Sequence, residues 1–351
     1  MLSLTASSIA LAVALSGAAV SPIPIYPTED PVLPKVGSET WIVYDETSDV
    51  VLASWNADER RSMASVTKVM TAMVVLDNVS TTDTVAVPSF ATRARGSTAG
   101  LIAGEEMTIN DLLVAMLIRS GNDAALTLAW YVGGESVDAF VAMMNEEASG
   151  LGLDDTQFMN PNGLDEEGHY STARDLMRLS VASLEYPDIQ RISRIRVVKL
   201  PEDPTGKARE YVNTNRLLGA YPGVVGLKTG DTPWAGKVLL SIAERGPRRL
   251  VVVVMGANDH FADARELLDW GFRTYGIRDR MLRPFFGEQG GGGSPPVLEL
   301  NLTTSHERRL SAMPKLDDGR WRISTISELP KGEAIGDWLR EALPESLGGD
   351  G

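Results

Sequence analysis

The chain contains no cysteine. Disulfide bonds, thiolate metal ligands, a cysteine nucleophile and a lipid-modified cysteine are therefore excluded. Histidine is almost as scarce, with only His169, His260 and His306. No His-Glu-x-x-His zinc pattern and no Gly-x-Ser-x-Gly nucleophile pattern occurs. We interpret the three histidines as polar loop or helix-end residues rather than catalytic groups.

Positive charge is also in deficit. Lys and Arg number 33 against 47 Asp and Glu, which gives a formal net charge of −14. Such an acidic protein is a poor candidate for binding nucleic acid or anionic lipid. Its 43% hydrophobic and 23% charged residues are typical of a globular protein, and 351 residues suffice for one large core or two domains.

The N-terminal segment lacks charge altogether, since no charged side chain precedes Glu29. Residues 1–20 are apolar or small, which is typical of a secretory signal cleaved after Ala18 or Ala19. The usual basic start is missing apart from the α-amino group, so a membrane anchor stays open as an alternative, although about 19 residues barely span a bilayer. The proline-rich residues 21–36 predict an extended linker. We expect the protein to act outside the cytoplasm.

Strand and helix signals alternate in blocks over residues 37–280, which predicts an α+β domain whose terminal segments close one sheet around a helical middle. The expected strands are 40–44, 50–54, 195–198, 224–227, 238–243 and 250–255. The expected helices are 65–78, 108–119, 123–132, 135–149, 172–184 and 259–275. The last two strands are so apolar that we expect them at the centre of the sheet, covered on both faces.

The C-terminal part has a different composition. Residues 287–296 are rich in glycine and proline and predict a flexible linker. Residues 297–351 form a small extension whose role the sequence does not indicate. Its last residues, 337–351, are acidic and unsuited to an anionic membrane.

The first candidate for chemistry is Ser65-Val66-Thr67-Lys68, where a loop runs into an apolar helix. The i, i+3 spacing places the Ser65 hydroxyl beside the Lys68 amine, at a helix start whose free N–H groups favour negative charge. Burial would lower the pKa of the lysine so that it can act as a base. Alone the pattern is weak, because it occurs by chance about once in a chain of this size. A capping serine with a solvated lysine is then the simpler explanation.

Two further motifs change this balance. Ser120-Gly121-Asn122 stands at a helix break, and Lys228-Thr229-Gly230 follows a predicted strand at a sheet edge. Helix capping and a surface lysine explain each motif separately. Together the three motifs supply a nucleophile, a base, a proton relay, oxyanion donors and a cation for a carboxylate, which is what acyl transfer requires. The combination is the signature of the penicillin-recognising serine enzymes.

The residues around these motifs resemble the D-alanyl-D-alanine carboxypeptidases of peptidase family S11, the low-molecular-weight penicillin-binding proteins. The resemblance covers about residues 38–278. The segments that carry it are 64–72, 117–125, 160–164, 170–176, 213–218 and 226–230. It implies a β-lactamase/transpeptidase-like fold, with an antiparallel sheet closed by the N- and C-terminal segments plus a helical region. It implies no metal and no organic cofactor.

The resemblance also implies catalytic roles. Ser65 would be the acylated nucleophile and Lys68 the general base that activates it. Ser120 would relay a proton toward the leaving D-alanine amine. Asn122 would orient the peptide and Lys68.

For the substrate, the resemblance implies that Lys228 and Thr229 of the Lys228-Thr229-Gly230 motif hold the terminal carboxylate. The backbone N–H groups of Ser65 and Asp231 would form the oxyanion hole. Many family members carry histidine where this chain has Asp231. A backbone contact is indifferent to that change, but the acid beside Lys228 is expected to weaken carboxylate binding.

The implied activity is removal of the terminal D-alanine from peptidoglycan stem pentapeptides ending in D-Ala-D-Ala, with β-lactams as inhibitors that acylate Ser65. A serine β-lactamase is an alternative, because it shares the fold and the motifs. It needs a deacylating glutamate, and we interpret Glu166 and Glu167 as loop surface instead. A non-catalytic penicillin- or peptidoglycan-binding scaffold is a third possibility, against which the intact Ser65, Lys68 and Asn122 argue. Whether acceptors other than water are used stays open.

Overall fold

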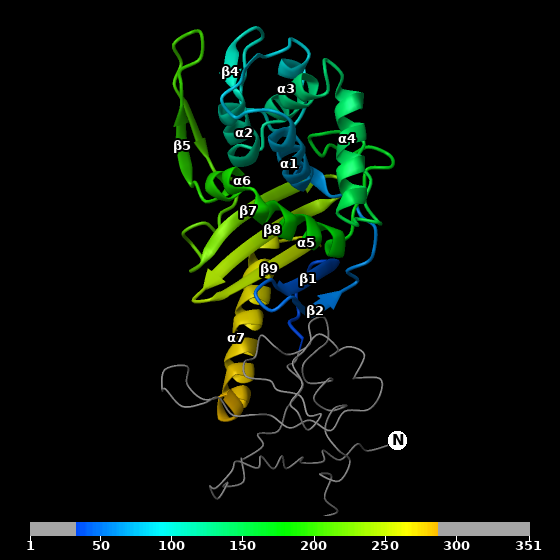
Figure 1. The fold of residues 1–351 in the computed structure, drawn as a ribbon, viewed down its shortest axis with the longest axis vertical. Coiled ribbons are helices and arrows are strands. Elements are labelled where there is room, and N and C mark those ends of the chain that lie inside the picture. The colour runs from blue at the N-terminus through cyan, green and yellow to red at the C-terminus, as the bar shows by residue number, and fades with distance from the viewer. Residues whose placement is uncertain (1–32, 287–351) are drawn as a thin grey trace, which may run out of the picture. The chain divides into compact units, whose positions relative to one another are not determined.

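The computed structural model describes residues 33–286. Its centre is a five-stranded sheet with the strand order β2-β1-β9-β8-β7 (Figure 1). The strands are β1 (Thr40–Asp45), β2 (Val50–Trp55), β7 (Val224–Thr232), β8 (Gly236–Arg245) and β9 (Arg248–Ala257). Pairing is antiparallel from β1 through β9 and β8 to β7. The prediction that early and late segments of the chain close one sheet is confirmed.

The two apolar strands lie at the centre of the sheet, as their composition predicts. Every side chain from Leu250 to Met255 in β9 is 0% exposed, and β8 is buried from Val238 to Ala243. Helix α5 (Ala173–Ala182) packs against β9, β1 and β8. Thr172 caps α5 by accepting a hydrogen bond from the Asp175 N–H.

The helical region surrounds α1 (Lys68–Asn78), whose residues from Lys68 to Val75 are all buried. Around it pack α2 (Ile109–Ile118), α3 (Asn122–Val132), α4 (Val137–Gly150), α5 and α6 (Pro187–Ser193). Thr108 caps α2 through the Asp111 N–H, as predicted. Ser65 does not lie in an α-helix. It lies in a 3₁₀ turn, η1 (Ala64–Thr67), which directly precedes α1.

Several short elements were not predicted. They are β3 (Thr84–Ala86), β4 (Glu106–Thr108), β6 (Arg209–Val212), α6, η2 (Ala91–Arg93) and η3 (Ser183–Glu185). Strands of three or four residues are too short to show a clear alternation of apolar and polar residues. Helix α6 follows η3 so closely that the apolar periodicity of the sequence does not separate them. Strand β5 (Val197–Leu200) begins two residues later than expected, and α7 (His260–Phe286) continues beyond residue 275.

Residues 35–47 and 52–269 form one compact unit, which contains every group discussed below except the extension of α7. Among the described residues, the second unit holds 33–34, 48–51 and 270–286. The predicted signal or anchor (1–20), most of the first linker (21–36), the second linker (287–296) and the extension (297–351) lie outside the described residues. None of the described helices combines the length and apolarity needed to cross a bilayer.

Candidate active site

Ser65 and Lys68 lie side by side at the junction of η1 and α1. The Lys68 Nζ is 2.9 Å from the Ser65 Oγ, and it also donates a hydrogen bond to the carbonyl of Asn162. Lys68 is 0% exposed, whereas Ser65 is only half-buried and faces a groove. The i, i+3 spacing therefore brings the hydroxyl and the amine together as expected.

Burial decides the charge of Lys68. Desolvation lowers its pKa well below the usual lysine value, the nearby charge of Lys228 lowers it further, and Asp123 opposes both effects. Desolvation disfavours the charged form of an amine because the interior cannot replace its hydration. A neutral Lys68 can accept the proton of the Ser65 hydroxyl.

The buried side chain of His169 is hydrogen-bonded to Thr67 of η1. The Met159 N–H donates to His169 Nδ1, so Nε2 carries the proton and donates to the Thr67 Oγ1 at 2.9 Å. Thr67 in turn donates to the carbonyl of Ala64. Burial lowers the pKa of His169 to about 4, which keeps the ring neutral. His169 is thus a loop residue as predicted, but the sequence did not indicate its link to the Ser65 turn.

The second and third motifs meet at one hydrogen bond. The Lys228 Nζ donates to the Ser120 Oγ at 3.0 Å and to the Thr229 carbonyl at 3.0 Å. Lys228 is 1% exposed, and burial lowers its pKa to about 7. Ser120 has a left-handed backbone with φ of 64°, as does Ala64 with φ of 53°. Non-glycine residues in this region are strained and concentrate at functional sites.

Asn122 is 2% exposed and fixed by the loop before it. Its backbone N–H donates to the Ser97 carbonyl at 2.8 Å, and its Nδ2 donates to the Arg95 carbonyl at 2.6 Å. Within residues 33–286 its buried Oδ1 accepts no hydrogen bond. Leaving a buried acceptor without a donor is costly, so this oxygen destabilises the loop that Asn122 otherwise holds.

Strand β7 passes very close to Ser65. A Cβ added to Gly230 would lie 2.8 Å from the Ala64 Cβ and 3.0 Å from the Ser65 backbone nitrogen. Only glycine permits this approach. The Thr229 Oγ1 donates to the Thr214 Oγ1 at 2.7 Å. Asp231 is exposed and, since side chains alternate along a strand, it lies on the face opposite to Lys228.

These groups line one groove of about 690 Å³. Its walls are Ser65, Ser97, Ser120, Val212, Asn213, Thr214, Arg216, Thr229, Gly230, Asp231, Lys237, Asn258, Asp259, His260 and Phe261. The predicted side chains of Ser65, Ser120 and Thr229 thus open into one groove, with the Lys68 and Lys228 amines bonded to the two serines. Asn122 lies beside the groove rather than on its wall.

Three neighbours of the motifs were not assigned a role from the sequence. The carbonyl of Asn162 holds Lys68, and Thr214 holds Thr229. Asp123 accepts backbone N–H groups from Ala99, Gly100 and Leu101 and so fixes the loop beside Ser97. All three residues lie within the segments that carry the family resemblance. That resemblance was the one feature of the sequence that could have pointed to them.

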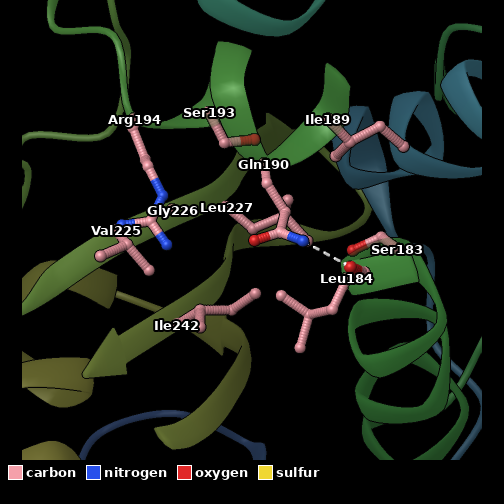
Figure 2. A pocket seen from close by; sticks show the side chains of 10 residues that line it. All are labelled: Ser183, Leu184, Ile189, Gln190, Ser193, Arg194, Val225, Gly226, Leu227 and Ile242. Atoms are coloured by element: carbon pink, nitrogen blue, oxygen red, sulfur yellow. Dashed lines mark hydrogen bonds between the residues drawn. The ribbon is translucent and has the colours of Figure 1, made fainter. Parts of the chain in front are cut away.

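A second, much smaller cavity lies between α6 and the stretch of β7 before Lys228 (Figure 2). Its volume is about 10 Å³, which is the lower limit of the space that can hold one water molecule. Figure 2 shows both apolar side chains, such as Ile189 and Ile242, and polar ones, such as Ser193 and Gln190, around it. The Gln190 Nε2 donates a hydrogen bond to the Leu184 carbonyl at 2.5 Å. None of the predicted site residues lines it, so we interpret it as a packing defect behind β7.

The family model for D-alanyl-D-alanine carboxypeptidase, peptidase family S11, matches residues 27–259. The chain belongs to this family. It is 37% identical over 242 residues to the D-alanyl-D-alanine carboxypeptidase DacF of Bacillus subtilis and 39% identical over 257 residues to DacC of Escherichia coli. The matches cover 67% and 69% of this chain but 62% and 63% of those relatives, less than two thirds of their lengths.

The fold of this chain is also found among solved structures. The crystal structure of the Streptomyces K15 DD-transpeptidase superimposes with a TM-score of 0.65 at 29% identity, covering 68% of this chain and 98% of that one. The predicted α+β fold of the β-lactamase/transpeptidase type is therefore confirmed. The structure also confirms that Glu166 and Glu167 are exposed loop residues.

Proposed function

We propose that this S11 family member is a serine D-alanyl-D-alanine carboxypeptidase that removes the terminal D-alanine from stem peptides through an acyl-enzyme on Ser65. The observation that carries the proposal is the contact of 2.9 Å between the Ser65 hydroxyl and Lys68, whose amine is fully buried. A serine next to a neutral lysine is an activated nucleophile. The groove in front of it is also lined by Ser120, whose hydroxyl accepts a hydrogen bond from the buried Lys228.

In the acylation step, Lys68 takes the proton of Ser65 as the hydroxyl oxygen attacks the carbonyl of the penultimate D-alanine. The oxyanion lies between the backbone N–H groups of Ser65 and Asp231. The close passage of Gly230 along the Ser65 nitrogen supports this placement. Preorganised donors of this kind are worth about 10²- to 10³-fold in rate each.

The leaving D-alanine needs a proton on its amine and an anchor for its carboxylate. Ser120 passes the proton, and its bond to Lys228 supports that role. Lys228 and the Thr229 hydroxyl hold the carboxylate, and Arg216 on the groove wall adds positive charge. Asn122 orients the peptide through the loop that it fixes, because its Nδ2 and N–H hold the Arg95 and Ser97 carbonyls and Ser97 lines the groove.

Water then hydrolyses the ester on Ser65. A β-lactamase of class A would need a glutamate beside the acyl group for this step. Glu166 and Glu167 are exposed, and Glu166 accepts a hydrogen bond from the side chain of Asn160. Their exposure favours slow hydrolysis of a β-lactam adduct and hence inhibition rather than resistance.

The proposed substrate class supports action outside the cytoplasm, where stem peptides of the cell wall lie. The apolar residues 1–20 support export, and retention of that segment as a membrane tether stays a prediction.

A fluorescent penicillin tests the proposed nucleophile. We expect one covalent adduct per chain, located on Ser65 by peptide mass spectrometry and absent in Ser65→Ala. The adduct should persist far longer than a β-lactamase intermediate. An adduct on another residue, or rapid turnover of the penicillin, would contradict the proposal.

A further inference from the structure

The peptide group between Ala64 and Ser65 carries one of the two proposed oxyanion donors. Its N–H belongs to Ser65, in the first turn of η1, where N–H groups have no partner inside the helix. Its carbonyl oxygen belongs to Ala64 and accepts a hydrogen bond from the Thr67 hydroxyl at 2.8 Å. Because a trans peptide group is planar and its N–H and C=O point in opposite directions, whatever holds the carbonyl also sets the direction of the N–H.

The backbone does not hold this peptide by its own preference. Ala64 has a φ of 53°, a left-handed conformation that a residue with a side chain keeps only where its surroundings impose it. Gly230 passes so close that a Cβ on it would lie 3.0 Å from the Ser65 nitrogen. Such packing limits where the peptide lies. The hydrogen bond to the Ala64 carbonyl then decides which way it is turned.

The Thr67 hydroxyl has one direction in which to donate. Threonine hydroxyls often donate to a carbonyl one turn back, so the bond to Ala64 alone indicates no function. Here, however, Thr67 is 0% exposed and its hydroxyl oxygen lies 2.9 Å from His169 Nε2. The Met159 N–H occupies His169 Nδ1, so the proton on Nε2 points at the Thr67 oxygen. The hydroxyl proton is thereby left for the Ala64 carbonyl.

The ring of His169 is fixed in turn. It is 3% exposed and packs edge to face against Phe158, with ring centroids 6.0 Å apart. Burial keeps the ring neutral by lowering its pKa to about 4, whereas a charged ring could not accept the Met159 N–H. The His169 hydrogen-bond chain therefore runs in one direction, from the Met159 N–H to the Ala64 carbonyl. Bonds in such chains polarise one another, which makes the N–H of the last peptide a stronger donor.

We propose that His169 is a positioning residue of the oxyanion hole, which acts through Thr67 to orient and polarise the peptide that ends in the Ser65 N–H. Neither His169 nor Thr67 lines the groove, so neither touches the substrate. The use of this N–H as an oxyanion donor rests on the proposed function. The chain itself rests on its hydrogen bonds, its burial and the one tautomer that they allow.

Two substitutions separate this chain from the other contacts of His169. An asparagine oxygen lies near the position of Nδ1, so His169→Asn retains an acceptor for the Met159 N–H but does not reach Thr67. A glutamine amide lies near the position of Nε2, so His169→Gln retains the donor to Thr67. We expect His169→Asn to slow labelling of Ser65 by fluorescent penicillin about 10- to 10²-fold, less than the loss of a whole oxyanion donor. His169→Gln should retain most of the wild-type rate.

Thr67→Val interrupts the same chain at its middle. It should slow labelling as much as His169→Asn does, and the double variant should be no slower than the slower single variant, because both remove one shared effect. Thr127→Val is the matched control. Thr127 is also 0% exposed, and its hydroxyl also donates to a carbonyl one turn back, that of Asp123. This control should be labelled at the wild-type rate.

The concentration and pH dependence of labelling distinguish positioning from a general loss of structure. The maximal rate should fall in His169→Asn, while the penicillin concentration that gives half of that rate stays unchanged, because the oxyanion develops only in the transition state. The acid limb of the rate, which reports Lys68, should also stay in place. Thermal unfolding shows whether each variant is folded, and Thr67→Val decides the outcome if His169→Asn is not.

Several results would overturn the proposal. They are wild-type labelling of the folded variants, equal slowing by His169→Gln and His169→Asn, additive effects in the double variant, and a change in the half-saturating concentration alone. A displaced acid limb would also overturn it, because His169 would then act through the pKa of Lys68.

D-alanine release from a peptide ending in D-Ala-D-Ala reports separately on the proposed function. Release that His169→Asn and Thr67→Val retain at the wild-type rate would keep the carboxypeptidase and remove the role of His169. A wild type that is labelled on Ser65 but releases no D-alanine, with both variants slow in labelling, would keep the positioning role and remove the carboxypeptidase.

Discussion

Lys68 and Lys228 have the same side chain, but we propose that Lys68 acts as a base and that Lys228 binds a carboxylate. Both are buried, and burial lowers the pKa of both amines. Lys68 also experiences the charge of Lys228, which keeps it neutral and basic. Burial lowers the pKa of Lys228 to about 7, and in the proposed function an anionic carboxylate bound beside it would restore its charge.

Lys68→Ala removes the base and should lower the rate of Ser65 acylation by about 10³-fold or more. The measurement is the rate of fluorescent penicillin labelling at neutral pH, with thermal unfolding to show that the variant is folded. A folded variant that is labelled at the wild-type rate would rule out Lys68 as the base.

The pH dependence of kcat/KM for a D-Ala-D-Ala peptide should be bell-shaped. Toward acid, protonation of Lys68 removes the base, and toward alkali, Lys228 loses its charge as the pH rises through about 7. We expect Lys228→Gln to have a higher KM and to lose the alkaline decline. An unchanged alkaline limb in Lys228→Gln would assign that limb to another group.

At the scale of elements, the sequence predicted correctly those helices, caps and hairpins whose formation depends on residues close together in the chain. The apolar periodicity of α1, the Thr108 cap of α2 and the apolar hairpin of β8 and β9 follow from neighbouring residues. The proximity of Ser65 to Lys68 needs only one helical turn. These features of the fold and of the site could therefore be read from the chain.

Contacts between distant segments could not be read in this way. The Lys68–Asn162 and Thr67–His169 contacts join residues 94 and 102 positions apart. Their geometry depends on how the irregular segment between α4 and α5 packs on η1. Family resemblance pointed to the segment, but only the fold shows that it touches Lys68.

Gly163 shows how tightly that segment packs. It has φ of 81°, and a Cβ on it would lie 2.0 Å from the Ala64 carbonyl oxygen. Gly163→Ala should lower the free energy of unfolding by about 3 kcal/mol, because backbone strain and a clash add together. It should also slow acylation, since the Ser65 turn must shift. Urea unfolding and penicillin labelling measure the two effects.

Gly150→Ala is the control for this change, because no atom lies within 4 Å of its added Cβ. It should change stability by no more than about 1 kcal/mol and leave labelling unaffected. Equal effects of the two substitutions would contradict the packing of the segment against η1.

At the scale of the whole molecule, burying cations has a thermodynamic consequence. The folded-state pKa of Lys228, about 7, lies below its unfolded value of 10.5. The unfolded chain therefore binds more protons between these values, and stability rises with pH across that window. Below about pH 7, Lys228 is charged in the folded state, and the full free-energy cost of burying that charge lowers the stability of the fold.

Lys228→Met removes this cost. The free energy of unfolding of the variant minus that of the wild type should fall by roughly 3 kcal/mol between pH 7 and pH 10. Urea unfolding at several pH values measures it. Lys199→Met, in a lysine whose side chain is 80% exposed, should give a flat difference. A flat or rising difference for Lys228→Met would contradict the buried charge.

The fold brings together motifs from the start of α1, the α2–α3 junction and β7, an edge strand of the sheet. The central claim is that this assembly cleaves the D-Ala-D-Ala bond with Ser65. Release of free D-alanine from a peptide ending in D-Ala-D-Ala, compared between wild type and Ser65→Ala, tests it most directly. We predict release by the wild type and none by Ser65→Ala. A wild type that releases no D-alanine, or a Ser65→Ala variant that releases it equally fast, would contradict the account.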